Sequence, residues 1–518
     1  MLNILLRNIA IITCAAIIIL LPSFIFGPGY SDSAKYNFIW VTQFGEEMAK
    51  GHLYPRWLPD SFEGLGSPTF YFYPPAAYWV SGSFKALGLS TLTAINMTAL
   101  IALAASGFAM HQWLAYQQAR ARLGAILYMA APYHLIDFYN RGALAEFVAL
   151  IWPPLIALSI HYLPRRRGIV GLALSYAGLI LTHLPLAMLT SIFLIAPLAM
   201  HMLVNNRILL APLIKGGSLG VALSAFYLLG AMTLQDHISS TLLWTPWYRA
   251  ASWSILAPNS LLLTDCGLLA LAVGGALLCA HKRSIWTLIT LIAAANALGL
   301  IPFVWDFEPL SQAQFPWRLL SIVEFAGITA LLRPQNSPKQ PSPVLIGLGG
   351  GFVLFAYIHW IPQIAANLMT PMNYAQLARD VPEAPEYLPA DFDLRLFQEH
   401  GRTVDLSAWR HLPRGDSITV TQPGEALFRR AAFPIWHVTR NGIEIPYRGP
   451  IVQFTAQPGV YKIERRLIWQ EIAGAILSII AALLLCALAL TKRRGGVYDS
   501  SDYASNHDDP LPVASENR

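Results

Sequence analysis

Long apolar runs are the feature that most restricts how this chain can fold. Twelve apolar runs, most of them about 20 residues long, follow one another along the 518 residues, and those at 122–138 and 168–183 are short enough to be tilted or incomplete spans. Only 12% of the residues are charged, whereas a soluble domain carries about 25%. The runs lie at residues 8–26, 88–115, 122–138, 146–163, 168–183, 185–204, 208–231, 259–281, 285–304, 317–333, 343–361 and 467–490. They predict an all-α polytopic membrane protein with about twelve transmembrane helices.

Basic residues mark every second connection between these runs. The basic connections hold Arg7; Arg120 and Arg122; Arg165, Arg166 and Arg167; Arg207; Lys282 and Arg283; Arg333 and Lys339; and Lys492, Arg493 and Arg494. Short basic connections face the cytoplasm. The pattern therefore predicts a multi-pass protein of a bacterial inner membrane with both termini cytoplasmic. The net charge of +6 follows from this orientation and does not indicate nucleic-acid binding.

The opposite connections are longer and rich in aromatic residues, which indicates that they carry the function. They divide the chain into a transmembrane domain at 1–361 with a large first outer loop at 27–75, a β-rich domain at 362–466, a final helix at 467–490 and a disordered cytoplasmic tail at 491–518. Residues 417–421 and 451–455 alternate as strands do, and Asn441-Gly442 and Pro458-Gly459 are turn signals. The β-rich domain is therefore predicted to be a small periplasmic β-sandwich.

Asp32 is the most informative acidic residue, because it lies just beyond the first run and the Gly27-Pro28-Gly29 helix stop. A helix begun by Ser31 or Asp32 and running through Trp40 and Phe44 would place Asp32, Lys35 and Tyr36 on one face. A carboxylate at the membrane boundary can act as a general base or hold a divalent cation. The alternative is a plain helix cap.

Arg141 and Arg318 are two basic residues on the outer side that depart from the pattern of basic connections. A guanidinium suits a phosphate because its planar fork forms paired hydrogen bonds. For Arg141 the alternative is an ion pair with Asp137 or Glu146, and for Arg318 it is a side chain that extends to the membrane interface.

Three further ionisable residues lie within apolar runs, and such residues usually face protein or water. His183, near the outer end of its helix, is expected to line the same cavity as Asp32. Asp265 and Glu324 are expected to be paired inside the bundle.

Aromatic and acidic segments complete the candidate site. Phe70-Tyr71-Phe72-Tyr73 lies between prolines and favours either an interfacial belt or one wall of a groove for a lipid or a sugar. The acidic segment at 380–393 contains Glu386 and Tyr387, which are predicted to contact the acceptor. The alternative is that this segment only packs the β-domain onto the membrane part.

Short motifs are spread over the chain from Asp32 to about Ser478. They are the Asp32 loop, Leu53-Tyr54-Pro55-Arg56-Trp57, Phe72-Tyr73-Pro74-Pro75, Ala131-Pro132-Tyr133-His134-Leu135, Arg141-Gly142-Ala143-Leu144-Ala145-Glu146, Thr182-His183, Phe315-Pro316-Trp317-Arg318, Glu386-Tyr387-Leu388-Pro389 and Phe433-Pro434-Ile435-Trp436. Together they resemble the bacterial membrane proteins named for a 6-pyruvoyl-tetrahydropterin-synthase-related domain. The architecture of that family resembles the GT-C glycosyltransferases. Many relatives carry His four residues after the Asp, where this chain has Tyr36.

The resemblance implies an inverting transferase that moves a sugar from a polyprenyl-phosphate donor to an envelope acceptor on the outer face of the membrane. Asp32 would be the catalytic base, and Arg141, Arg318, His183, Tyr36 and Lys35 would surround the donor phosphate. The partners are then the lipid-linked sugar and membrane lipid. Two other functions stay open: a transporter or flippase of lipid-linked saccharides, which should have inverted repeats and broken helices, and a non-catalytic membrane scaffold.

Overall fold

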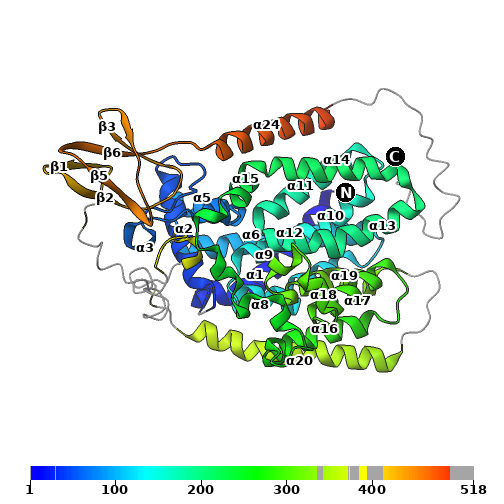
Figure 1. Ribbon diagram of the computed structural model, residues 1–518. Coiled ribbons are helices and arrows are strands. Elements are labelled where there is room, and N and C mark those ends of the chain that lie inside the picture. Colours follow the sequence, from blue (N-terminus) through cyan, green and yellow to red (C-terminus); the bar gives the residue numbers. More distant parts are fainter. Residues whose placement is uncertain are drawn as a thin grey trace.

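Helix is present in each of the twelve predicted runs (Figure 1). The computed structural model describes residues 2–29, 31–334, 342–370, 373, 384–393, 412 and 414–490. The predictions for Lys339, Glu383, the Lys492-Arg493-Arg494 cluster and the disordered tail lie outside the described residues.

The bundle contains α1 (Leu2–Phe26), α6 (Thr91–Tyr116), α7 (Ala121–Met129), α8 (Pro132–Tyr139), α9 (Leu144–Ala149), α10 (Trp152–His161), α11 (Arg166–Thr182), α12 (Leu184–Thr190), the π-helical η1 (Ser191–Ile195), α13 (Ala196–Asn205), η2 (Arg207–Leu209), α14 (Leu210–Leu223), α15 (Ala225–Thr233), α16 (Cys266–Cys279), α17 (Ile285–Ala297), α19 (Leu320–Leu332), α20 (Pro343–Met369) and α24 (Trp469–Leu490).

The twelve predicted membrane-spanning helices are confirmed only in part. Among the described residues six helical segments are long and apolar enough to cross a membrane, or up to seven if a bent pair counts as one span. They are Asn3–Phe26, Thr91–Tyr116, Leu144–His161, Leu184–Asn205, Pro343–Met369 and Trp469–Leu490. The protein is thus a multi-pass membrane protein, but twelve spans are not confirmed. The apolar helices α16 and α17 have 14 and 13 residues. They are therefore about 20 Å long, whereas the hydrocarbon core is about 30 Å thick.

One apolar segment is sharply broken, although no broken helix is evident from the sequence. Arg207–Leu223 and Ala225–Thr233 meet at an angle of 71° around Ser224. The last helix satisfies the backbone groups at this break. The Phe226 amide donates to Ser478 Oγ at 3.0 Å, and that hydroxyl donates to the Ala222 carbonyl at 3.0 Å. The break is therefore held by contacts with α24.

The first predicted outer loop is itself helical and lies next to the strands in Figure 1. Gly27 and Gly29 adopt positive φ values of 83° and 74°, which ends α1 as the sequence predicted. The loop and the following segment contain α2 (Ala34–Ala49), α3 (Ser61–Gly64), α4 (Thr69–Phe72) and α5 (Ala76–Ala86). The N-terminal end of α1 and the C-terminal end of α24 lie at the opposite end of the bundle.

Short elements join the later helices and lead into the candidate site. They are η3 (Gln235–His237), η4 (Ser240–Trp244), η5 (Pro246–Tyr248), η6 (Ala250–Trp253), η7 (Leu261–Thr264), α18 (Pro302–Asp306), η8 (Leu310–Ala313), η9 (Pro316–Leu319) and η10 (Pro385–Tyr387). Pro389 forms a β-bridge with Ile238, and the Ser239 amide donates to the Leu388 carbonyl at 2.8 Å. The segment 384–393 is therefore fastened to the connection that follows α15.

The predicted antiparallel β-region is confirmed near the C-terminus. Its strands are β1 (Ser417–Val420), β2 (Gly424–Ala431), β3 (Trp436–Arg440), β4 (Ile443–Ile445), β5 (Ile451–Ala456) and β6 (Gly459–Arg465). They form one sheet in the order β1-β6-β3-β4 and a second sheet of β2 and β5, all antiparallel. The rings of Phe454 in one sheet and Tyr461 in the other are 4.9 Å apart. Asn441 and Gly442, at φ values of 51° and 79°, form the predicted tight turn between β3 and β4.

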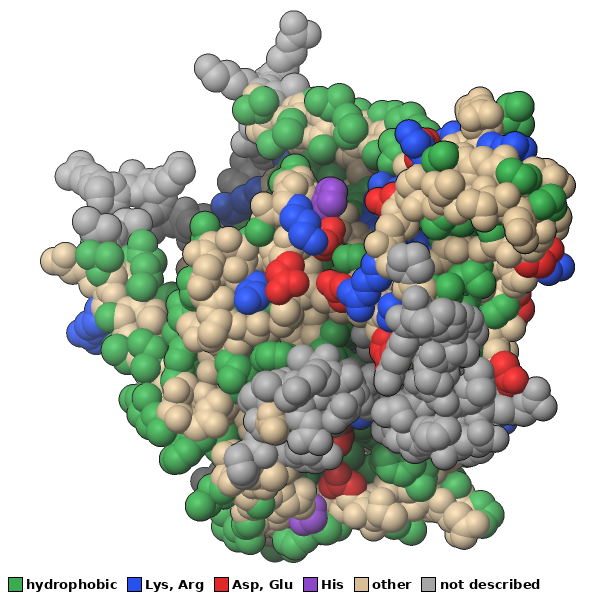
Figure 2. Space-filling view, turned by 90° about the vertical axis from the view of Figure 1, so that its left-hand side faces the viewer, with side chains coloured by type: hydrophobic (Ala, Val, Ile, Leu, Met, Phe, Trp, Pro, Cys, Tyr) green, Lys and Arg blue, Asp and Glu red, His purple; other side chains and the backbone are tan. Residues whose placement is uncertain are grey.

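The β-region is attached to the first outer loop and to the start of α24. The Ala431 amide donates to the Leu65 carbonyl at 2.8 Å, and the rings of Trp57 and Trp436 meet edge to face at 5.1 Å. Figure 2 looks onto this end of the molecule and shows acidic and basic side chains lying next to one another. Exposed ion pairs such as Arg414–Asp60, at 2.8 Å, belong to this junction.

A buried carboxylate completes the attachment. Glu471 in α24 accepts hydrogen bonds from Arg465 Nη2 at 2.6 Å and from the Tyr71 hydroxyl at 3.0 Å. Arg56 Nε lies 3.5 Å from the same oxygen, Oε1. The guanidinium of Arg56 also lies 4.4 Å from the centre of the Tyr54 ring. We call Glu471, Arg465, Arg56 and Tyr71 the Glu471 cluster.

Candidate functional site

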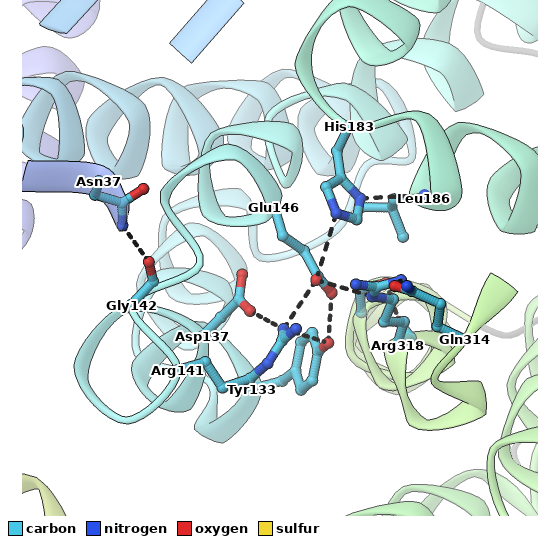
Figure 3. Close-up of polar contacts among 11 residues, drawn as sticks. Asn37, Tyr133, Asp137, Arg141, Gly142, Glu146, His183, Leu186, Gln314 and Arg318 are labelled. Carbon is cyan, nitrogen blue, oxygen red and sulfur yellow. Dashed lines mark hydrogen bonds and ion pairs between the residues drawn. The ribbon is translucent and has the colours of Figure 1, made fainter. Parts of the chain in front are cut away.

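Glu146 is the centre of a buried polar cluster that draws on three separate parts of the chain (Figure 3). Its side chain is 0% exposed. Oε1 accepts a hydrogen bond from the Tyr133 hydroxyl at 2.6 Å, and Oε2 accepts from Arg141 Nη1 at 2.9 Å and from Arg318 Nε at 3.2 Å. His183 Nε2 lies 3.7 Å from Oε2. We call these five residues, together with Asp137, the Glu146 cluster.

The turn between α8 and α9 places Arg141 and Glu146 side by side. Gly142 in this turn has a φ of +61°, and a Cβ there would lie 2.2 Å from Ser31 Oγ, so only glycine fits. The Ala143 amide donates to the Asp137 carbonyl at 2.8 Å, which closes the turn. The chain therefore reverses tightly enough for both side chains to point inward.

The same turn is bonded to the loop that carries Asp32. The Asp32 amide donates to the Asn140 carbonyl at 3.4 Å, and the Ser33 amide donates to the Arg141 carbonyl at 2.9 Å. Asn37 in α2 donates through its side-chain amide to the Gly142 carbonyl. These bonds hold the start of α2 against the back of the Glu146 cluster.

Arg141 forms both ion pairs that the sequence offered as its alternative role. Its Nη1 donates to Asp137 Oδ1 and to Glu146 Oε2. The guanidinium lies 4.4 Å from the centre of the Trp317 ring, which supports its plane. The side chain is 14% exposed, so one edge still meets solvent.

Arg318 is buried in the Glu146 cluster, and only 8% of its side chain is exposed. Beyond the bond to Glu146, its Nη1 donates to the Ala313 carbonyl at 3.0 Å and to Gln314 Oε1 at 3.4 Å. Gln314 has a φ of 62°, an uncommon conformation for a residue other than glycine. Such conformations persist where the surrounding structure holds the backbone, and they are common at active sites and ligand-binding sites.

His183 lies at the break between α11 and α12. Its Nδ1 accepts a hydrogen bond from the Leu186 amide at 3.2 Å, so Nε2 carries the proton of the neutral ring. That nitrogen faces Glu146, as Figure 3 shows. His183 thus belongs to the Glu146 cluster, and the prediction that it lines the same cavity as Asp32 stays a prediction.

Asp32, Lys35 and Tyr36 lie beside the cluster and not within it. Asp32 is exposed and precedes α2, whose N-cap is Ser33 without a side-chain cap bond, so the predicted cap at Ser31 or Asp32 is wrong. Lys35 Nζ lies 5.0 Å from the centre of the Tyr36 ring. Among the described residues, Glu146 is contacted by Tyr133, Arg141, His183 and Arg318 and not by these three.

The aromatic segment forms a core with one edge toward the cluster. Phe70 and Tyr71 are buried, whereas Phe72 and Tyr73 are half-buried. The Tyr73 ring lies 4.8 Å from the Trp40 ring. Burial raises the pKa of Tyr73 to about 12, and the charges of Arg318, Glu146 and Arg141 also act on its hydroxyl. Tyr73 therefore lies close to the Glu146 cluster.

Glu386 and Tyr387 lie on the far side of these rings. Tyr387 is buried, stacks on Phe72 at a ring distance of 6.1 Å and lies 6.2 Å from Trp40. Glu386 is half-buried, and desolvation raises the pKa of its carboxyl group to about 7. Tyr387 thus belongs to the aromatic core that also contains Tyr73, and Glu386 precedes it in η10.

Asp265 and Glu324 are not paired with one another, contrary to the sequence prediction. Glu324 accepts from the Tyr133 amide at 2.6 Å and lies 3.3 Å from His134 Nδ1. Asp265 accepts from the Leu268 amide at 3.3 Å at the start of α16. The reason is that each carboxylate is used by a nearby helix N-terminus.

The sequence interpretation missed the central position of Glu146, named Tyr133 only as part of a motif, and gave Gln314 no role. Glu146 entered only as a partner of Arg141, although a carboxylate at the start of an apolar run is itself a functional signal. No sequence pattern relates Gln314 or Arg318 to Glu146, because about 170 positions separate them. Across the described residues no group of three or more His, Cys, Asp or Glu side chains is arranged to hold a metal ion.

Comparisons with known proteins give a limited result. No protein-family model matches the chain, and no curated protein matches it. Among solved structures, the arabinofuranosyltransferase AftD from Mycobacteria is similar at 16% identity over 70% of this chain, with a TM-score of 0.44. A mutant of that enzyme gives 16% identity over 69% of this chain and a TM-score of 0.40. The chain spans 27% of the length of both. These values are too low for the likeness to carry an argument about function.

Proposed function

We propose that this protein is a GT-C-like glycosyltransferase of a bacterial inner membrane. It moves a sugar from a polyprenyl-phosphate donor to an envelope acceptor on the outer face. The observation that carries the proposal is the convergence of Arg141 and Arg318 on one buried carboxylate, directly behind the loop that presents Asp32 to solvent. A phosphate binder and a candidate base are the two parts that this chemistry needs.

In the proposed reaction Asp32 accepts the proton of the acceptor hydroxyl, whose oxygen then attacks the anomeric carbon of the donor sugar. The bond between that carbon and the phosphate oxygen breaks, and the lipid phosphate leaves with the bonding electrons. Arg141 and Arg318 stabilise the negative charge that grows on this phosphate. His183 is proposed to donate from Nε2 on the same side, and Tyr36 and Lys35 to border the donor next to Asp32.

The β-region and the segment that contains Glu386 and Tyr387 are proposed to select the acceptor. They supply no proposed catalytic group. The link through Phe72, Tyr73 and Trp40 supports this, because it connects Tyr387 to the neighbourhood of the arginines.

The test is the substitution Asp32→Asn, which is nearly isosteric but cannot accept the proton. Membranes that contain the protein receive radiolabelled polyprenyl-phosphate sugars, and transfer to envelope acceptors is measured. We expect a loss of about 10²–10⁴ in rate. The matched control is Asp60→Asn, since Asp60 is an exposed carboxylate in the same loop whose ion pair with Arg414 joins the β-region. Full activity of Asp32→Asn would remove Asp32 from the mechanism and favour a scaffold.

A flippase of lipid-linked saccharides is the second candidate, favoured by the 71° break at Ser224 and the helix break at His183. Broken helices are common at transport sites. Translocation of a fluorescent lipid-linked saccharide across proteoliposomes, unchanged in Asp32→Asn, would support the flippase over the transferase.

A further inference from the structure

The two arginines of the Glu146 cluster are held close together although their charges repel. Arg141 Nη1 and Arg318 Nε lie 2.9 Å and 3.2 Å from the same oxygen, Glu146 Oε2. Without a shared anion, two neighbouring guanidiniums would move apart. Glu146 is itself fixed, because the Tyr133 hydroxyl binds its other oxygen at 2.6 Å and its side chain is fully buried.

Each guanidinium uses only some of its N–H donors in hydrogen bonds to protein groups. Arg141 uses Nη1 for all three of its bonds, and Arg318 uses Nε and Nη1. Among the described residues, no hydrogen bond is formed by Nη2 of either arginine or by Nε of Arg141, and none of these nitrogens is sealed from solvent. A guanidinium has five N–H donors, so both side chains keep a free edge.

The planes of these free edges are also set by the protein. The Trp317 ring lies 4.4 Å from the Arg141 guanidinium, and the Phe315 ring lies 5.0 Å from that of Arg318. Gln314 and the Ala313 carbonyl hold Arg318 from a third direction. The pair is therefore arranged before any ligand binds, which lowers the entropy lost on binding.

We infer that Glu146 is a positioning residue that joins Arg141 and Arg318 into one clamp for the phosphate of a lipid donor. Glu146 binds the inner edges of the two guanidiniums, and the phosphate binds the outer edges. Glu146 touches neither the sugar nor the phosphate. This inference rests on the proposed function, because it needs a phosphate-bearing lipid as the substrate.

The test measures binding of farnesyl phosphate and of farnesol to the full chain in lipid nanodiscs. The unaltered protein should prefer the phosphate. Glu146→Gln should weaken binding of farnesyl phosphate about tenfold or more and leave binding of farnesol unchanged, because only the clamp is lost. Glu146→Asp, which keeps the charge, should recover part of the affinity. The matched control is Glu471→Gln, which removes a carboxylate bound by two arginines and a tyrosine elsewhere and should not alter the preference.

If Glu146→Gln does not fold, the arginines provide the second measurement. If Glu146 joins the two arginines into one clamp, Arg141→Gln and Arg318→Gln should each weaken binding of farnesyl phosphate. The double variant should then lose little more affinity than either single variant. Losses that multiply in the double variant, or a Glu146→Gln protein that keeps its phosphate preference, would overturn the inference. An unaltered protein without any preference for the phosphate would overturn the donor proposal and this inference with it.

Discussion

Glu146 and Glu471 are two buried carboxylates with nearly the same partners and very different surroundings. Each is bound by one tyrosine hydroxyl and approached by two arginines. In the Glu471 cluster, Arg56 also donates to the Phe226 carbonyl at 3.0 Å and packs against the rings of Tyr54 and Tyr71. That cluster connects the last helix, the β-region and the first outer loop, which is a structural task.

The Glu146 cluster has the additional features of a site. It includes His183 at a helix break, and it is bonded from behind to the loop that carries Asp32. Arginines with unbonded donors are present in both clusters, since Arg465 also bonds through Nη2 alone. The comparison teaches that a buried ion cluster is not by itself a sign of function, and that its surroundings distinguish a junction between elements from a candidate site.

The largest expected effect concerns which end of the bundle is outside. The alternation of basic connections predicts that Asp60, an exposed residue of the first outer loop near Gly64, is outside and that Arg166 is inside. Single cysteines at positions 60 and 166, in a background without the four native cysteines, should be labelled in intact cells at position 60 only. Labelling at 166 with protection at 60 would place both clusters on the wrong side for an envelope acceptor.

The second prediction separates the two clusters by activity. Arg318→Gln should lower kcat by about 10²–10³, because a positive charge is lost where the leaving phosphate becomes negative. Arg465→Gln, in the Glu471 cluster, should change kcat little and instead make the β-region more sensitive to limited proteolysis. Equal losses of kcat in both variants, measured in the same membranes, would mean that the Glu146 and Glu471 clusters do not differ in function.

The smallest expected effect comes from Glu386, a carboxylate that no described arginine contacts. Desolvation raises its pKa from 4.5 to about 7, so the folded protein binds this proton more tightly than the unfolded chain does. The contribution of Glu386 to stability should therefore be fully present below about pH 4.5 and be lost as the pH rises through about 7. Glu386→Gln should remove this decline, which is worth about 1–2 kcal/mol, less than the full shift because the side chain is partly exposed.

Thermal unfolding in detergent at pH 5 and pH 8 measures this difference between the two proteins. The control is Glu425→Gln in the β-region, where the carboxylate is exposed and accepts from Arg448 at 2.9 Å. A pH dependence that is the same in Glu386→Gln and in the unaltered protein would show that Glu386 is not desolvated in solution.

The amino-acid sequence by itself determined the local features of this protein. The apolar runs specified helices, the glycines after Phe26 ended α1, and the alternation at 417–421 and 451–455 specified β1 and β5. These outcomes follow from neighbours within a few positions, through hydrophobic period and turn conformation. The same reasoning did not identify the breaks inside the runs, because apolar composition does not reveal where a run is divided into short helices such as α7 and α8.

Tertiary structure alone decided which charged groups meet. Arg141 meets Glu146 through a local turn and Arg465 meets Glu471 six positions further on, but Arg318 reaches Glu146 from about 170 positions away and Arg56 reaches Glu471 from a distant part of the chain. The sequence interpretation placed Arg318 at the donor phosphate without identifying Glu146 as its partner, and it expected Asp265 and Glu324 to pair. A buried charge is stable only with partners that compensate it, and those partners are selected by the packing of the whole bundle. Sequence therefore identified the residue types capable of the chemistry, and packing selected the carboxylate around which two of the arginines gather.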